Sequence, residues 1–114
     1  MSGLSLEELE KKKAELEKII EKLEKQANVI EEKYEKAKRL EDKVFEKMRI
    51  SRDESERAML EVKYIRISEK KKEIENKLEE IKKKLIGAKR ELEEVNRTID
   101  YIRPKGGKWI EEKV

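Results

Sequence analysis

Apolar residues recur along this chain at alternating steps of three and four positions, in two long runs. The first run consists of Leu6, Leu9, Leu16, Ile20, Leu23, Ala27, Ile30, Tyr34, Ala37, Val44 and Met48. The second run consists of Leu60, Tyr64, Ile67, Ile74, Leu78, Ile81, Leu85, Ala88, Leu92, Val95, Ile99 and Ile102. These steps are typical of the a and d heptad positions, which form the seam between coiled-coil helices. The pattern therefore predicts an all-α fold, a long antiparallel two-helix coiled-coil hairpin with helices over about 5–50 and 54–103.

Signals for helix ends support these boundaries. Ser5 and Glu8 have the spacing of a capping box, in which each side chain satisfies a free backbone donor of the other residue. Pro104 pushes the residue before it out of helical geometry and so ends the second helix. Between them, residues 51–56 are rich in capping residues, which predicts the chain reversal there. Either Ser51 or Asp53 suits the start of the second helix, and Asp53 leaves the longer turn.

The lengths of the two runs favour one register. If the two ends are flush, paired residues have numbers that sum to 108, which places Leu9 beside Ile99 and Leu16 beside Leu92. Antiparallel coiled coils then pack a against d positions throughout. The neighbouring register, with a sum of 101, would leave Ile99 and Ile102 without partners. We therefore expect the first register.

Three charged residues interrupt the seam: Lys13, Glu41 and Lys71. In the favoured register they face, in that order, Val95, Ile67 and Ala37. We expect their aliphatic stems to lie on apolar surface and their charged heads to reach water. Such residues either help to fix register and strand number or are ordinary imperfections of a two-stranded seam.

A continuous helix is the alternative to the hairpin. No Gly or Pro interrupts residues 51–56, so one helix of about 98 residues could pair with a second, antiparallel chain through the same contacts. The heptad frame changes between Met48 and Leu60, and a continuous coil would have to absorb that change as a local winding defect. The frame change favours the hairpin.

Composition excludes a globular core, because 52% of the residues are charged and only 35% are apolar. The net charge of +3 is small, which argues against a nucleic-acid partner. The abundance of Lys, Glu and Ile resembles that of thermostable proteins from hyperthermophiles, and idealised designed helices share this bias. No targeting segment or membrane-spanning run is evident, so we expect a cytoplasmic protein that does not enter membranes.

The residue types present leave little room for catalysis. The sequence has no Cys and no His, and therefore lacks a thiolate, an imidazole base and the usual zinc ligands. We expect no enzymatic activity and no cofactor. Asp53, Glu54 and Glu56 are a weak candidate cation site, since acidic residues also favour helix starts for electrostatic reasons. We expect no metal there.

In length and plan the chain resembles the prefoldin β subunits, hairpin coiled coils whose arm ends hold unfolded clients. The β-prone segment 62–67 stands where that family places a strand, although the seam runs through it. This resemblance implies a chaperone. The acidic tip resembles that of transcript-cleavage factors, which implies a regulator that binds RNA polymerase or nucleic acid through the tip. Both resemblances concern architecture alone.

The function that the sequence favours is a structural or protein–protein interaction module. Five apolar residues lie beside the seam and widen the apolar stripe: Ile19, Phe45, Met59, Ile65 and Ile86. A wide stripe suits bundles of three or four helices, so we expect self-association into a dimer of hairpins. Residues 104–114 form a short tail after the hairpin of residues 1–103. There Trp109 and Ile110 are a candidate anchor for a partner, or a cap over the open end of the hairpin.

Overall fold

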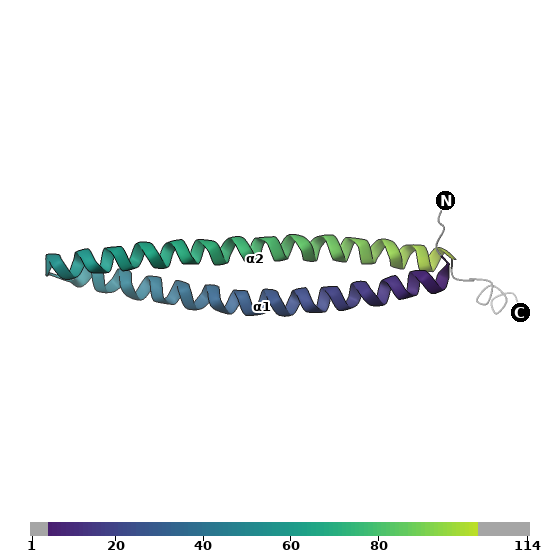
Figure 1. Ribbon diagram of the computed structural model, residues 1–114, viewed down its shortest axis with the longest axis horizontal. Helices are drawn as coiled ribbons and strands as arrows, with labels where there is room; N and C mark the ends of the chain where they lie inside the picture. The colour runs from purple at the N-terminus through teal and green to yellow at the C-terminus, as the bar shows by residue number, and fades with distance from the viewer. Residues whose placement is uncertain (1–4, 103–114) are drawn as a thin grey trace, which may run out of the picture. The chain divides into compact units, whose positions relative to one another are not determined.

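The computed structural model describes residues 5–102, which form two helices and no strand. Helix α1 runs over Leu6–Ile50 and helix α2 over Glu54–Ile102 (Figure 1). The predicted all-α helical hairpin is confirmed, and residues 62–67 belong to α2 instead of a strand. Neither helix has an apolar stretch long enough to cross a membrane, within the part of the chain described. The predicted tail with Trp109 and Ile110 lies outside the described residues.

The start of α1 follows the predicted capping box in part. The Glu8 N–H donates to Ser5 Oγ at 3.2 Å, which satisfies one free backbone donor of the first turn. The Glu8 carboxylate, however, accepts the Ser5 hydroxyl at 3.3 Å and not the Ser5 N–H. The cap is therefore a serine cap whose hydroxyl is held in place by the glutamate.

The connection between the helices is residues 51–53, and its geometry selects between the two predicted helix starts. The Ser55 N–H donates to Asp53 Oδ1 at 3.0 Å, and the Arg57 N–H donates to the Asp53 carbonyl at 2.9 Å. Asp53 is therefore the N-cap of α2. The Ser51 N–H donates to the Lys47 carbonyl and thereby completes the last turn of α1. The helices are thus separate, and the chain reverses within three residues.

The chain divides into two compact units. We call the described residues 5–23 and 84–102 the end unit, and Glu24–Lys83 the tip unit. In each unit a segment of α1 lies beside a segment of α2 (Figure 1). The end unit buries four apolar side chains in one cluster, with Leu6 and Leu92 packed against it. The four are Leu9, Leu16, Val95 and Ile99.

The tip unit has a sparser interior. Its buried residues are Ala27, Val44 and Leu78 together with one charged residue, Glu41. Two contacts there report the register. Phe45 and Tyr64 meet with ring centroids 5.8 Å apart, and Ser68 bonds to Glu41. Both pairs join residues whose numbers sum to 109, which agrees with the favoured register. In the alternative register Phe45 would lie opposite Glu56, eight residues before Tyr64.

The burial of the predicted seam residues follows the heptad pattern in both units. Buried are Leu9, Leu16, Ile20, Ala27, Val44, Leu78, Val95 and Ile99. Half-buried are Leu6, Leu23, Ile30, Tyr34, Ala37, Met48, Leu60, Tyr64, Ile67, Ile74, Ile81, Leu85, Ala88 and Leu92. Ile102, the last residue of α2, is exposed. Half-burial of so many seam residues is expected of a two-helix seam, whose two sides face solvent.

Candidate functional site

A hydrogen-bonded charge cluster lies within the seam of the tip unit. The Lys71 ammonium donates to Glu41 Oε1 at 2.8 Å, and the Ser68 hydroxyl donates to Glu41 Oε2 at 2.6 Å. The side chains of Glu41 and Lys71 are only 11% and 24% exposed. Both carboxylate oxygens are therefore bonded in a partly buried setting, where hydrogen bonds to a charged group are strong.

The cluster holds both groups in their charged forms. The hydrogen bond from Lys71, followed by that from Ser68, keeps the pKa of Glu41 below its ordinary value, although burial acts in the opposite direction. The same bond raises the pKa of the Lys71 ammonium. Because the Glu41 side chain is largely shielded from solvent and both of its oxygens already accept a hydrogen bond, it is poorly placed to take a ligand. We therefore assign this cluster a structural role.

The cluster corrects the expectation that the charged heads in the seam each reach water. Glu41 and Lys71 meet each other instead, because Lys71 lies one helical turn beyond the residue that faces Glu41. Lys13, in the end unit, behaves differently. It is half-buried and forms no ion pair with any described residue.

Beside this seam the tip unit carries an exposed apolar surface. We define the Phe45 surface as Phe45 and Met48 of α1 together with Glu61, Tyr64, Ile65, Ser68 and Lys72 of α2. Phe45 is 48% exposed and Ile65 is 50% exposed. The Phe45 ring rests at a tilt of 49° on the Tyr64 ring, so aromatic side chains from both helices contribute to this surface.

The Phe45 surface contains two shallow hollows. One, of about 400 Å³, is lined by Tyr64, Ile65, Ser68, Glu69 and Lys72. The other, of about 330 Å³, is lined by Phe45, Met48, Arg49, Arg57 and Glu61. Each hollow thus has an apolar wall from the aromatic pair and charged residues at its margin. This combination resembles an interface core with a polar rim.

The five apolar residues predicted beside the seam are all exposed, and the structure adds others that the heptad pattern did not single out. Ile19, Phe45, Met59, Ile65 and Ile86 range from 48% to 75% exposed. Further exposed residues are Val29, Leu40, Ile50, Val62 and Tyr101. Leu40 and Phe45 lie on opposite flanks of the seam, since successive helical residues are about 100° apart. Single exposed apolar residues are common on protein surfaces, but the Phe45 surface combines several with hollows.

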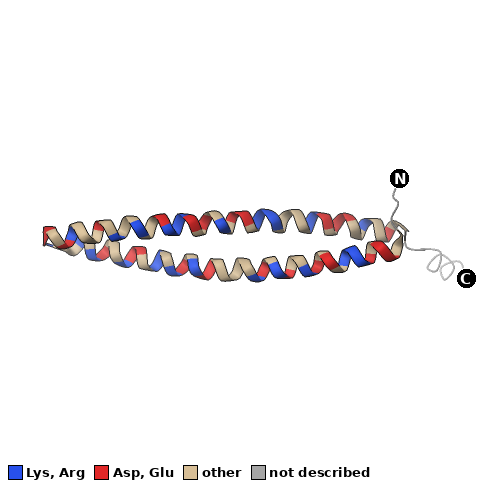
Figure 2. Ribbon diagram, in the orientation of Figure 1, with Lys and Arg blue, Asp and Glu red and all other residues tan. Residues whose placement is uncertain are grey.

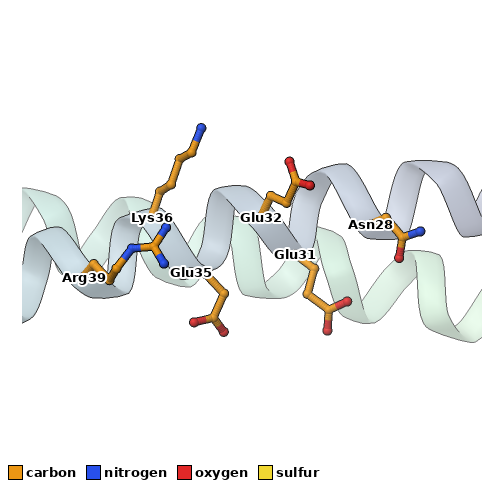
Figure 3. Close-up of a pocket in the computed structure, with 6 residues that line it drawn as sticks. All are labelled: Asn28, Glu31, Glu32, Glu35, Lys36 and Arg39. Atoms are coloured by element: carbon orange, nitrogen blue, oxygen red, sulfur yellow. The ribbon is translucent and has the colours of Figure 1, made fainter.

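A larger hollow, of about 590 Å³, lies along α1 of the tip unit and has little capacity for chemistry. It is lined by Asn28, Glu31, Glu32, Glu35, Lys36 and Arg39, all from one helix. Glu32 and Lys36 point to one side of the helix, whereas Glu31 and Glu35 point to the other (Figure 3). Because these side chains diverge, they offer no convergent set of ligands.

The remaining charges are distributed without a dominant sign. Basic and acidic residues are interspersed along both helices (Figure 2). No group of three acidic side chains in the described residues is arranged to hold a metal ion. At the tip, Asp53 is engaged in capping α2, and its Oδ1 accepts the Ser55 N–H. Within the described residues, the exposed apolar Phe45 surface is therefore the feature that calls for explanation.

Comparisons with known protein families, with curated proteins and with solved structures find no match for this chain.

Proposed function

We propose that this protein is a non-catalytic coiled-coil interaction module that self-associates through the Phe45 surface. The observation that carries the proposal is the pair of half-exposed side chains, Phe45 and Ile65, on the same flank of one unit. A two-helix seam requires apolar residues at a and d positions only. When a further helix covers large apolar residues outside the seam, their burial stabilises the assembly.

The chemistry of the chain supports an interaction role over a catalytic one. The sequence lacks Cys and His, and Glu41, whose carboxylate is the most buried among the described residues, has both oxygens bonded to Ser68 and Lys71. The Phe45 surface itself has the aromatic and apolar centre that is typical of binding hot spots.

Sedimentation velocity over a concentration series tests this function. We expect the mass to rise from the 13.7 kDa of one chain towards twice that value as concentration increases. We expect Phe45→Ser to weaken association and Leu40→Ser to leave it unchanged, because the two residues are similarly exposed on opposite flanks. A wild-type mass of one chain at every concentration would contradict the proposal.

A second candidate function is the holding of unfolded clients by the end unit. The observation that favours it is the exposure of Tyr101, at 85%, and of Ile102, at 39%, in the last turn of α2. A holdase should suppress the aggregation of a thermally unfolding test enzyme. Tyr101→Ser should reduce this suppression and Val29→Ser should not. Equal suppression by both variants would count against the end unit as the client site.

A further inference from the structure

We infer that the second copy docks on the Phe45 surface about a two-fold axis perpendicular to α2, with Glu61 of each copy beside Lys72 of the other. This inference rests on the proposed self-association and adds the orientation and the charge pairing of the two copies. It follows from the order of residues along one face of α2.

That face is a short stripe with heptad spacing. Glu61, Ile65, Ser68 and Lys72 follow one another at steps of four, three and four residues, which places them on one side of the helix. The apolar Ile65 and the small Ser68 occupy the centre, and opposite charges occupy the two ends. Phe45 of α1 lies next to this stripe through its contact with Tyr64.

Both end charges are available to a partner. Within the described residues neither Glu61 nor Lys72 forms an ion pair, whereas Arg49, which borders the same surface, bonds to Glu46 at 2.6 Å. The stripe therefore presents one uncompensated negative charge and one uncompensated positive charge, separated by 11 residues of helix.

This charge order determines which orientation of a second copy is favourable. A perpendicular two-fold axis near the centre of the stripe reverses the direction of the second helix, so each Glu61 meets a Lys72 and two ion pairs form. A parallel arrangement would place Glu61 against Glu61 and Lys72 against Lys72. Because a two-fold interface repeats every contact, the reversed orientation has two attractive contacts between opposite charges. The parallel orientation has two repulsive contacts between like charges.

The docked copy would also cover apolar surface. Ile65 of each copy meets Ser68 and Ile65 of the other at the centre, and each Phe45 ring lies at the margin of this contact. The hollow of about 400 Å³ beside Ile65 provides space for side chains of the second copy. Exposed ion pairs contribute little affinity each, so the apolar centre supplies the affinity and the charges supply the orientation.

Charge reversal tests this arrangement by sedimentation. Glu61→Lys and Lys72→Glu should each weaken dimerisation by about tenfold, because each single change creates two like-charge contacts. Glu73→Lys and Lys63→Glu make the same changes of net charge on residues outside the stripe. These two control variants should dimerise as the wild type does, and thermal unfolding should show that all four variants remain folded.

Mixing the two single variants gives the decisive result. In an equimolar mixture, the lysine introduced by Glu61→Lys in one chain meets the glutamate introduced by Lys72→Glu in the other, and the second contact, between the unchanged Lys72 and Glu61, is likewise attractive. We expect the mixture to recover the affinity of the wild type as a heterodimer. A wild-type dimer whose affinity the single reversals leave unchanged, or a mixture as weak as its components, overturns the two-fold docking. A monomeric wild type overturns the proposed self-association itself.

Discussion

The end unit and the tip unit are built from the same two helices, yet they use the seam differently. In the end unit Leu9, Leu16, Val95 and Ile99 are between 3% and 6% exposed and form one apolar cluster. In the tip unit the seam includes Ala27, Ala37 and the buried Glu41, and most of its apolar seam residues are only half-buried. We therefore expect a single apolar residue of the end-unit cluster to contribute more to stability than a seam residue of the same type in the tip unit.

The tip unit has features that the end unit lacks. The bonds of Glu41 with Lys71 and Ser68 specify the register of the two helices, because a shift along the seam would separate the three groups. The Phe45 surface lies on the same unit. The difference indicates that the end unit has the more deeply buried apolar seam, whereas the tip unit combines a hydrogen-bonded charge cluster with the exposed Phe45 surface.

Truncation of an apolar seam residue should cause the largest loss of stability, and the loss should differ between the two units. Ile99→Ala removes a residue that is 3% exposed and should lower the free energy of unfolding by about 3 kcal/mol. Ile74→Ala makes the same change at a half-buried seam position of the tip unit, where about 1–2 kcal/mol is expected. Urea denaturation of the two variants measures both. A larger loss at Ile74 would show that the tip unit, and not the end unit, dominates stability.

Replacement of a seam lysine should give the second-largest difference in stability between the two units. Lys71→Met leaves the Glu41 carboxylate with Ser68 alone and should lower the free energy of unfolding by about 2 kcal/mol, since a nearly buried charge loses its partner. Lys13→Met changes a half-buried lysine that has no ion pair and should be neutral or stabilising. Equal losses of stability in the two variants would contradict the structural role assigned to the Glu41 cluster.

The end unit also contains a residue whose replacement should raise stability. Gly87 lies inside α2, its backbone is not left-handed, and a Cβ added there meets no atom within 4 Å. Gly87→Ala should therefore increase the free energy of unfolding by about 1 kcal/mol. Denaturant unfolding checks the sign. A decrease would show that the position is closely packed in the folded protein.

Acid titration should give the smallest effect. Because the pKa of Glu41 is lowered on folding, its contribution is fully present above the ordinary pKa of glutamate, near pH 4.3, and is lost as the pH falls through the lowered value. Glu41→Gln should therefore reduce the loss of thermal stability between about pH 5 and about pH 3. Glu46→Gln, at an exposed glutamate paired with Arg49, is the control and should change this slope less.

The helices and their connection could be predicted from local patterns. The three- and four-residue steps mark the seam from Leu6 onward, and the candidate caps Ser5 and Asp53 mark the two helix starts. These signals are visible in sequence because each depends on neighbours within one or two turns. The end of the second helix was expected at residue 103, which lies outside the described residues.

The Glu41 cluster was missed because it depends on contacts between helices. Pairing residues one to one placed Glu41 opposite Ile67 and Lys71 opposite Ala37, as two separate imperfections. In the structure, long side chains reach diagonally across one turn, and Ser68, outside the a and d positions, joins them. Two opposite charges in adjacent layers of the favoured register were the signal that could have revealed it. Likewise, the sequence places Phe45 and Ile65 beside the seam, but only the contact of the Phe45 ring with Tyr64, the neighbour of Ile65 in the chain, shows that they share a flank.

Pulsed dipolar spectroscopy on two single-cysteine variants tests the central claim most directly. The chain contains no cysteine, so a spin label at Asn76→Cys in the tip unit or at Lys18→Cys in the end unit is unique. Asn76 lies 11 residues beyond Ile65 on the same face of α2, one turn past Lys72 at the end of the proposed contact. Docking through the Phe45 surface predicts one defined intermolecular distance for the Asn76→Cys label, which disappears on dilution with unlabelled protein. An undefined or absent coupling at Asn76, with a defined distance at Lys18 instead, would contradict self-association through the tip unit.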